Sequence, residues 1–196
     1  MRIEPVTLVG RHVRLEPLSE NHVADLAVAG RDPETWRWMP YGEVTTSDRM
    51  LAWVRDLLSR QARGTDLPFA VVHLPSGRAI GCTRYLDIQP ANRAVEVGGT
   101  WYAPEHQRTP ANTECKLLIL GHAFERVVVN RVQFKTDLRN ERSQRALERI
   151  GAVREGVLRD QMVMPDGHVR SSAYYSILAR EWPGVRAFLE SRLHPP

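Results

Sequence analysis

The spacing of apolar and polar residues divides the first third of the chain into one strand and two helices. Residues 12–18 alternate apolar and polar side chains, which is typical of a strand with one buried face. Apolar residues then recur at helical spacing over 19–30 and again over 47–64, and each of these patterns ends at a glycine. The segment between them, 33–46, mixes Pro, Gly and aromatic residues, as in a loop or a broken helix.

After residue 66 the pattern changes to short β-rich segments. These segments, 67–74, 79–88 and 94–103, are separated by turns that contain Pro, Gly and Asn. Segments of this kind in close succession favour an antiparallel meander.

The rest of the chain alternates helices and strands. The pattern predicts a helix at 113–129, a strand at 131–138, a helix at 140–151, a hairpin at 152–178 with Asp-Gly in its turn, and a final helix at 181–193. No internal repeat or low-complexity linker interrupts this order, and 196 residues suit one domain of ordinary size. We therefore expect a single domain over residues 1–196.

The charges are dispersed along the chain. The composition is 42% hydrophobic and 26% charged, as in a soluble globular protein, and the formal net charge is +4. Acidic residues stand between the arginines nearly everywhere, so there is no basic block of the kind that binds nucleic acid, and we do not expect a nucleic-acid partner. A modest anionic ligand is compatible with this balance.

The cysteines and the N-terminal segment bear on metal binding and location. Cys82 and Cys115 are not in a CxxC pair or at zinc spacing from a His, so we expect buried, inert thiols and no metal site. The N-terminus lacks a continuous apolar core, and no apolar segment approaches the roughly 20 residues that span a bilayer. We expect a cytoplasmic protein without a membrane partner; a homodimer is compatible with the sequence, which shows no clear interface.

The junction HQRTPANTECK, residues 106–116, is the first candidate for chemistry. A loop that leads from a strand into a helix leaves the first N–H groups of the helix unpaired, and the helix dipole adds positive charge there. Asn112 or Thr113 can cap the helix, and Arg108 brings a full charge to the same place. The segment predicts an anion site; the alternative is a plain turn with a solvated arginine.

Two further segments add to this candidate. In VEVGGTWYAP, Glu96 lies on a strand that the pair Gly98–Gly99 interrupts, which predicts a bulge that splays this strand from the next and exposes main-chain groups. In NERSQRALERIG, Asn140 starts a helix, and Ser143 projects from the same side of its first turn. The alternatives are a structural strand glutamate and a simple helix cap with a solvated serine.

At this point the sequence resembles the GCN5-related N-acetyltransferases, in particular the branch with the ribosomal-protein alanine acetyltransferases. The motifs that carry the resemblance are E-V-G, W-Y-A-P-E-H-Q-R, T-E, A-F-E, N-E-R-S and L-E-R-I-G-A-V-R-E-G, in this order between residues 95 and 176. The resemblance implies an α/β (α+β) fold with a mixed, mostly antiparallel twisted sheet, helices on both faces, and a V-shaped opening beside the bulged strand. It also implies acetyl-CoA as the acyl donor.

The resemblance assigns residues to that cosubstrate. In the family, the loop before the helix has the pattern Q/R-x-x-G-x-G/A and cradles the pyrophosphate; here Pro110 and Asn112 stand at its two small positions. Main-chain groups around Trp101 and Tyr102 would pair with the pantetheine arm. The expected cofactor-binding residues are Trp101, Tyr102, Gln107, Arg108, Thr109, Pro110, Ala111, Asn112, Thr113, Asn140 and Ser143.

The resemblance also implies a reaction, the direct attack of a primary amine on the thioester. Glu96 is the candidate base, and His106 and His168 are alternatives. Leu147 stands where many family members have a tyrosine acid, which leaves Ser143 as the candidate donor to the thiolate. The acceptor would be a small-molecule amine or a peptide N-terminus. The alternative function is a non-catalytic acyl-CoA-binding protein with the same fold.

Overall fold

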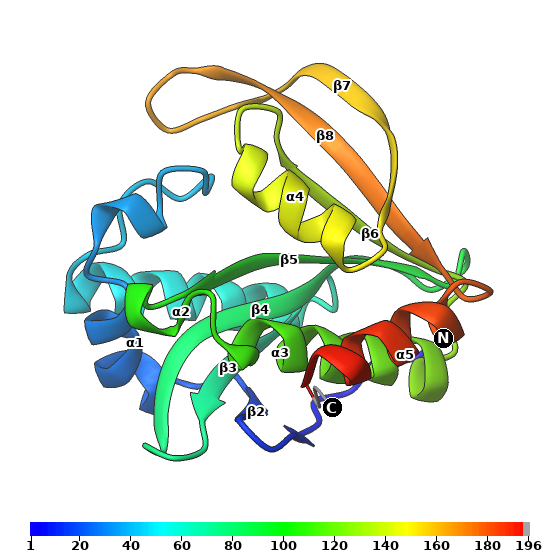
Figure 1. Cartoon of the computed structure of the whole chain (residues 1–196). Helices are drawn as coiled ribbons and strands as arrows, with labels where there is room; N and C mark the ends of the chain where they lie inside the picture. Colours follow the sequence, from blue (N-terminus) through cyan, green and yellow to red (C-terminus); the bar gives the residue numbers. More distant parts are fainter. Residues whose placement is uncertain (194–196) are drawn as a thin grey trace.

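One sheet of eight strands runs through the structure, which is a computed structural model that describes residues 1–193. The strand order is β1-β2-β3-β4-β5-β6-β8-β7, and the parallel pair is β5 with β6 (Figure 1). The strands are β1 Leu8–Val9, β2 Val13–Pro17, β3 Leu67–His73, β4 Arg78–Gln89, β5 Ala94–Tyr102, β6 Arg131–Asp137, β7 Val153–Val163 and β8 Val169–Leu178. The mixed, mostly antiparallel sheet is therefore confirmed.

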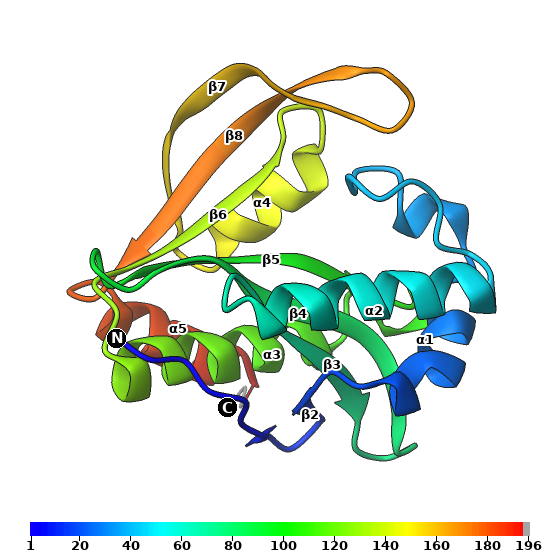
Figure 2. The same ribbon diagram turned by 180° about the vertical axis from the view of Figure 1, so that it is seen from behind.

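Helices cover both faces of the sheet, as expected. They are α1 Val23–Ala29, α2 Ser47–Ala62, α3 Pro110–Gly121, α4 Glu141–Arg149 and α5 Trp182–Leu193, with short 3-10 turns at Glu20–His22, Pro33–Thr35 and Pro104–His106. Helices α1 and α2 lie on one face (Figure 2), and α3 and α5 lie on the other. We call these the α2 face and the α3 face.

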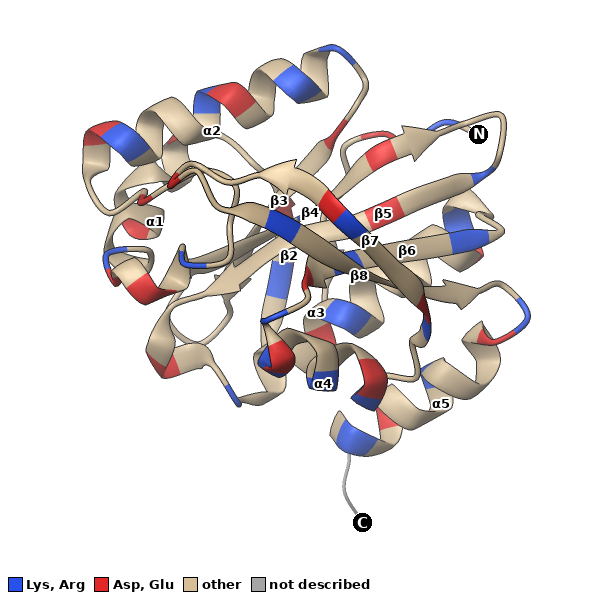
Figure 3. Ribbon diagram, turned by 90° about the horizontal axis from the view of Figure 1, so that it is seen from above, with Lys and Arg blue, Asp and Glu red and all other residues tan. Residues whose placement is uncertain are grey.

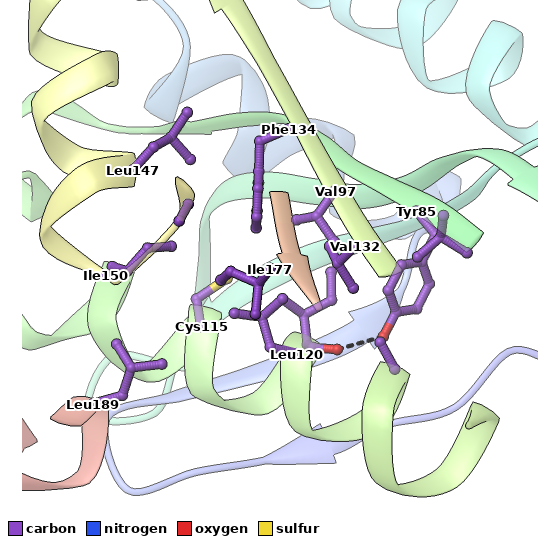
Figure 4. Close-up of a cluster of buried hydrophobic side chains, with 14 of the residues drawn as sticks. Tyr85, Val97, Cys115, Leu120, Val132, Phe134, Leu147, Ile150, Ile177 and Leu189 are labelled. Atoms are coloured by element: carbon purple, nitrogen blue, oxygen red, sulfur yellow. Dashed lines mark hydrogen bonds between the residues drawn. The ribbon is translucent and has the colours of Figure 1, made fainter. Parts of the chain in front are cut away.

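Each face has its own hydrophobic core. On the α3 face, Cys115 and Leu120 belong to one cluster with Phe134 of β6, Leu147 of α4 and Ile150, the C-cap of α4 (Figure 4). On the α2 face a separate cluster contains tryptophans and residues of α1 and α2. Since successive residues of a strand point to opposite faces, the central strands β3, β4 and β5 contribute residues to both clusters. The two faces of the sheet therefore have different side chains near its centre.

A buried polar contact ties α3 to the sheet. The hydroxyl of Tyr85 donates to the carbonyl of Ile119 over 2.5 Å, and the tyrosine is fully buried (Figure 4). This bond satisfies a hydroxyl that would otherwise be costly to bury. It also fixes the position of α3 beneath β4.

A second anchor of α3 was not predicted. Glu114 is 4% exposed, and its carboxylate accepts hydrogen bonds from the main-chain N–H groups of Arg11, His12 and Val13 at 2.7, 2.7 and 2.8 Å. A Cβ on Gly10 would lie 2.4 Å from Oε2 of this carboxylate, so only glycine fits beside it. Glu114 thus holds the turn between β1 and β2 against the helix that forms one wall of the candidate site.

The predicted helix at 113–129 differs most from the structure. Helix α3 begins earlier, at Pro110, and the α-helical hydrogen bonding ends at Gly121. The chain continues as a π-helix over His122–Val127 and closes at Val128, whose φ is +60°. A continuous apolar stripe does not distinguish these two helix types, since both bury one face.

The final hairpin and the dispersed charge agree with the sequence. Strands β7 and β8 pair antiparallel, and the turn between them holds Gly167 at φ +83°. Lysine and arginine alternate with acidic residues over the elements seen in Figure 3. Among residues 1–193, no helix has the length and apolarity to span a membrane.

Candidate active site

Strands β5 and β6 pair over a short length and then separate. Their register runs from Ala94 with Arg131 to Glu96 with Gln133. Beyond these pairs, β6, β8 and β7 run away from β5, and the two parts of the sheet meet at one end like the arms of a V (Figure 1). The predicted splay is confirmed, and it leaves one edge of β5 without a neighbouring strand from residue 97 onwards.

A bulge in β5 accompanies this separation. Gly99 and Thr100 of β5 together stand opposite the single residue Thr83 of β4. Gly99 has φ +57°, and a Cβ there would lie 3.3 Å from the Nε of Arg84. Both the backbone conformation and the space therefore favour glycine, which explains the glycine pair that interrupts the strand.

The main chain of Tyr102 faces the opening. The N–H of Ala103 donates to the carbonyl of Ile80 on β4 over 2.8 Å, so the preceding residue presents its main-chain groups to the other side. The carbonyl of Tyr102 accepts a hydrogen bond from Nε2 of Gln107 at 3.1 Å. By the same alternation, the main chain of Trp101 is directed towards β4. Of the two residues expected to bind through the backbone, Tyr102 is the one that faces the V.

The junction after β5 folds as a helix N-terminus, with the cap earlier than predicted. Thr109 is the N-cap, and its Oγ1 accepts from the N–H of Ala111 at 3.3 Å. Asn112 and Thr113 lie within the first turn, so the prediction that one of them caps the helix was wrong. The reason is Pro110, which occupies the first helical position, where its fixed φ fits and the helix requires no N–H.

The charges around this N-terminus suit an anion. Arg108 is exposed, has φ +62°, and directly precedes Thr109, the N-cap of α3. Asn112 and Thr113 are half-buried in the first turn, where N–H groups have no partner within the helix. The peptide dipoles add positive charge at the same place. A phosphate group fits this arrangement.

A second arginine reaches the same loop from the opposite arm of the V. Nη2 of Arg142, in the first turn of α4, donates to Oε1 of Gln107 over 2.5 Å. Gln107 therefore joins Tyr102 on β5 to α4 through both ends of its side-chain amide. Arg142 was not predicted from the sequence, because the spacing of residues on a surface helix does not show which loop that helix contacts.

Helix α4 begins where predicted, at Asn140. The Oδ1 of Asn140 accepts from the N–H of Ser143 at 3.1 Å, so the side-chain oxygen caps the helix while the amide nitrogen is left for another acceptor. Ser143 is half-buried. Leu147, one turn further along α4, is buried in the core on the α3 face (Figure 4). Its side chain has no proton to donate to a leaving thiolate.

Glu96 lies at the apex of the V. It is 2% exposed, and its carboxylate accepts from Nε2 of Gln133 at 3.1 Å and pairs with Nζ of Lys135 at 3.4 Å. Burial raises the pKa of Glu96 above its usual value, although Lys135 and Gln133 act to lower it. Because Gln133 and Lys135 flank Phe134, which faces α3, Glu96 belongs to the α2 face.

Polar residues of β8 surround Glu96 on this face. Burial raises the pKa of Tyr174, and the negative charge of Glu96 adds to this effect. Arg170 is 4% exposed and donates from Nε to the hydroxyl of Ser172 at 3.0 Å. These residues and Lys135 were not predicted from the sequence. The available signal was the period-two spacing of polar side chains along strands that it assigned correctly.

The aromatic residues of 33–46 divide into two groups. Trp36 is buried and packs against Trp53 and Trp101, with ring centroids 5.7 and 4.9 Å away, so it anchors this segment in the core of the α2 face. Trp38 is half-buried and reaches the other arm of the V, where the guanidinium of Arg139 lies 5.2 Å from its ring centroid and Nη1 of Arg170 donates to its carbonyl at 3.5 Å. The loop over residues 36–46, which we call the Trp38 loop, therefore borders the α2 face of the opening.

The cysteines and histidines are placed away from this polar group. Cys82 and Cys115 are fully buried, and burial raises the pKa of Cys82 to about 12, so its thiol stays protonated. The ring of His106 packs on that of His73 at 4.7 Å, and His168 lies in the turn between β7 and β8. Across residues 1–193 there is no group of three or more His, Cys, Asp or Glu that could hold a metal ion.

Comparison with known proteins agrees with this geometry. The chain is 33% identical over 113 residues to "Putative ribosomal N-acetyltransferase YdaF" of Bacillus subtilis (strain 168), a match that covers 58% of this chain and 61% of that relative. A GCN5-related N-acetyltransferase from Brucella melitensis has 30% identity and a TM-score of 0.92, with 98% of this chain and 87% of that one covered. The crystal structure of a "putative acetyltransferase" from T. thermophilus has 41% identity and a TM-score of 0.89, covering 99% and 100% of the two chains.

The family is shown by a match to most of the sequence. The family model described as "Acetyltransferase (GNAT) domain" matches residues 12–153, which include β5, the bulge, the α3 N-terminus and α4. The chain therefore belongs to the GNAT acetyltransferase family.

Proposed function

We propose that this chain is an acetyl-CoA-dependent N-acetyltransferase that moves an acetyl group to a primary amine by direct attack. The observation that carries the proposal is the position of Glu96, a buried carboxylate with a raised pKa at the apex of the V. One edge of β5 and the N-terminus of α3 lie along the same opening. The candidate base Glu96, the free edge of β5 and the anion site at the N-terminus of α3 thus lie along the same opening.

The residues along this path fit the donor. Its pyrophosphate suits the first turn of α3 with Arg108 and Arg142, and the fit does not require an N–H from Pro110. An amide-containing arm suits the free edge of β5 at Tyr102 and the amide nitrogen of Asn140. This chain's residues would thus bind a phosphorylated, amide-rich cosubstrate along the V, with its acyl end towards the bulge.

Glu96 provides the base for the acceptor. An amine attacks only when neutral, and it must lose a proton after the C–N bond forms. A carboxylate with a raised pKa is a stronger base than an exposed one, and Gln133 and Lys135 hold it in place. In this scheme Glu96 accepts that proton, directly or through a water, and Ser143 donates a hydrogen bond to the leaving sulfur from α4.

The acceptor reaches Glu96 from the α2 face. That side is bordered by the Trp38 loop and by Arg139 and Arg170, while α3 and α4 close the other side. The name of the Bacillus subtilis relative, a ribosomal N-acetyltransferase, favours an acceptor that belongs to the ribosome. A peptide N-terminus presents a primary amine on an extended chain, which suits an opening of this form better than a bulky amine.

The test is a pair of measurements on the whole chain. Calorimetry with CoA reports binding, and release of free thiol from acetyl-CoA in the presence of N-terminal peptides or small amines reports turnover. Saturable thiol release that depends on the amine supports the proposal. Binding of CoA without turnover for any amine would instead favour the acyl-CoA-binding alternative.

A further inference from the structure

A lysine on the opposite side of the sheet from Glu96 is buried at the same opening. Lys116 of α3 is 7% exposed. Its Nζ donates to Oγ1 of Thr100 at 3.3 Å and lies 5.6 Å from the centroid of the Phe134 ring. Among the ion pairs of residues 1–193, none includes Lys116.

A lysine in this setting has no structural advantage over an apolar residue. Fully buried lysines are rare unless they are paired, because the ammonium loses its hydration. The contacts here supply one hydroxyl and the face of one ring, which compensate only part of that loss. Burial accordingly lowers the pKa of Lys116. An unpaired buried cation at an opening points to a function.

The two contacts place the ammonium between the diverging strands. Thr100 is part of the bulge of β5, and Phe134 is the first residue of β6 beyond its last pair with β5. On the α3 face, Nζ of Lys116 therefore lies between Thr100 of β5 and Phe134 of β6. The hydroxyl of Thr100 also forms a hydrogen bond with the hydroxyl of Thr83 at 2.8 Å. Glu96 lies on the α2 face of the same gap. The opening has a carboxylate on one side and an ammonium on the other.

We propose that Lys116 is a further catalytic residue, whose ammonium stabilises the negative charge that develops on the thioester during acyl transfer. The inference rests on the proposed function. When the amine nitrogen bonds to the carbonyl carbon, the C=O electron pair moves to oxygen. When C=O re-forms, the C–S bond breaks and its electrons leave with sulfur. The nitrogen's surplus proton goes to Glu96, and Lys116 keeps its protons throughout.

A preorganised cation in a dry site is effective in this role. It needs no reorganisation when the charge appears, and it acts with little screening by water. The ground-state thioester is neutral, so Lys116 gains its partner only as the reaction proceeds. The structure thus assigns proton acceptance to the α2 face and charge stabilisation to the α3 face.

The test compares Lys116→Met with the wild-type chain. Methionine fills similar space without the charge, and loss of one such donor lowers kcat by roughly 10²- to 10³-fold. The Kd for CoA, which has no acyl carbonyl, should change less than about threefold by calorimetry, since Lys116 acts on the transition state. Arg126→Met, which removes an exposed cation after α3, is the matched control and should leave kcat unchanged.

The outcomes separate this inference from the function on which it rests. An unchanged kcat in Lys116→Met, or a weaker Kd with kcat retained, overturns the catalytic role. Absence of turnover in the wild-type chain defeats the proposed function instead. If Lys116→Met does not fold, Thr100→Val removes the hydroxyl that holds Nζ, and an unchanged kcat in that variant also overturns the inference.

Discussion

Nζ of Lys135 lies 3.4 Å from Oε2 of Glu96, the residue of β5 in the last pair that joins β5 to β6. The two side chains face the α2 side of the opening from neighbouring strands. Their pairing keeps a buried carboxylate ionisable where the strands separate. The site therefore depends on the way the sheet divides as well as on the residues it carries.

Glu96→Gln should remove most of the turnover. The amide keeps the shape of the side chain but cannot accept a proton, so we expect kcat to fall about 10²-fold or more with little change in KM for acetyl-CoA. Initial-rate kinetics measure both constants. Glu190→Gln, a partly exposed residue in the last turn of α5, should behave like the wild type; equal rates for Glu96→Gln and the wild type would rule out the base.

The pH dependence of activity in the wild-type chain should show the ionisation of Glu96. Glu96 must be ionised to act as a base, and its pKa is raised above 4.5 by burial. Activity should therefore be lost as pH falls through this raised pKa, with an acid limb at higher pH than an exposed carboxylate would give. This limb should be absent from the residual rate of Glu96→Gln; its persistence there would assign it to another group.

Gly99→Ala should harm the site more than the fold. Gly99 and Gly77 have φ of +57° and +67°, so alanine costs each position about 1–2 kcal/mol of stability. At Gly99 the new Cβ also meets Arg84 at 3.3 Å, whereas Gly77 has open space. Urea unfolding should show similar losses, and only Gly99→Ala should lower kcat, by about tenfold or more. Equal kcat in the two variants would contradict the role of the bulge.

Arg108 and Pro110 should affect CoA binding differently. Arg108→Ala removes a charge from the α3 N-terminus and should weaken CoA by roughly 1–3 kcal/mol, with a smaller loss at high salt. Pro110→Ala should keep Kd within about threefold, because the first helical position needs no donor. Calorimetry at two salt concentrations measures both effects. A large gain in affinity from Pro110→Ala would show that the proline distorts the site.

Glu114→Ala should destabilise the chain by about 1–3 kcal/mol. The substitution removes the acceptor of three main-chain N–H groups, of which the one of Val13 is buried and those of Arg11 and His12 are partly exposed to water. A buried donor left unpaired costs roughly 1–3 kcal/mol. Urea unfolding measures the loss, and Glu105→Ala on the surface is the comparison. A loss below about 1 kcal/mol would mean that water replaces the carboxylate.

The sequence predicts the helices and strands of the fold better than the junctions and contacts between them. The alternation in 67–103 and the Asp-Gly turn are local signals, so the meander and the hairpin were found. The cap at Thr109 was missed because polar residues at Asn112 and Thr113 looked equally suitable, and the fixed φ of Pro110 decided between them.

In the candidate site, too, local features could be predicted from the sequence and contacts between distant segments could not. Gly98–Gly99 indicated the bulge, because glycine in a strand has a local cause. Lys135 and Arg142 could not be assigned, since their roles follow from contacts across the V with residues more than thirty positions away. Lys116 lies in a segment that was correctly predicted to be helical, yet its burial depends on which strands that helix covers.

Mass spectrometry of the acceptor is the decisive test of acetyl transfer to an amine. The whole chain is incubated with isotopically labelled acetyl-CoA and a set of peptides with free N-termini, and acetylated peptide and free thiol are quantified together. We predict one labelled acetyl group on a primary amine for each thiol released, with both products sharply reduced in Glu96→Gln. Thiol release without an acetylated amine, or neither product despite bound CoA, would contradict the proposed function.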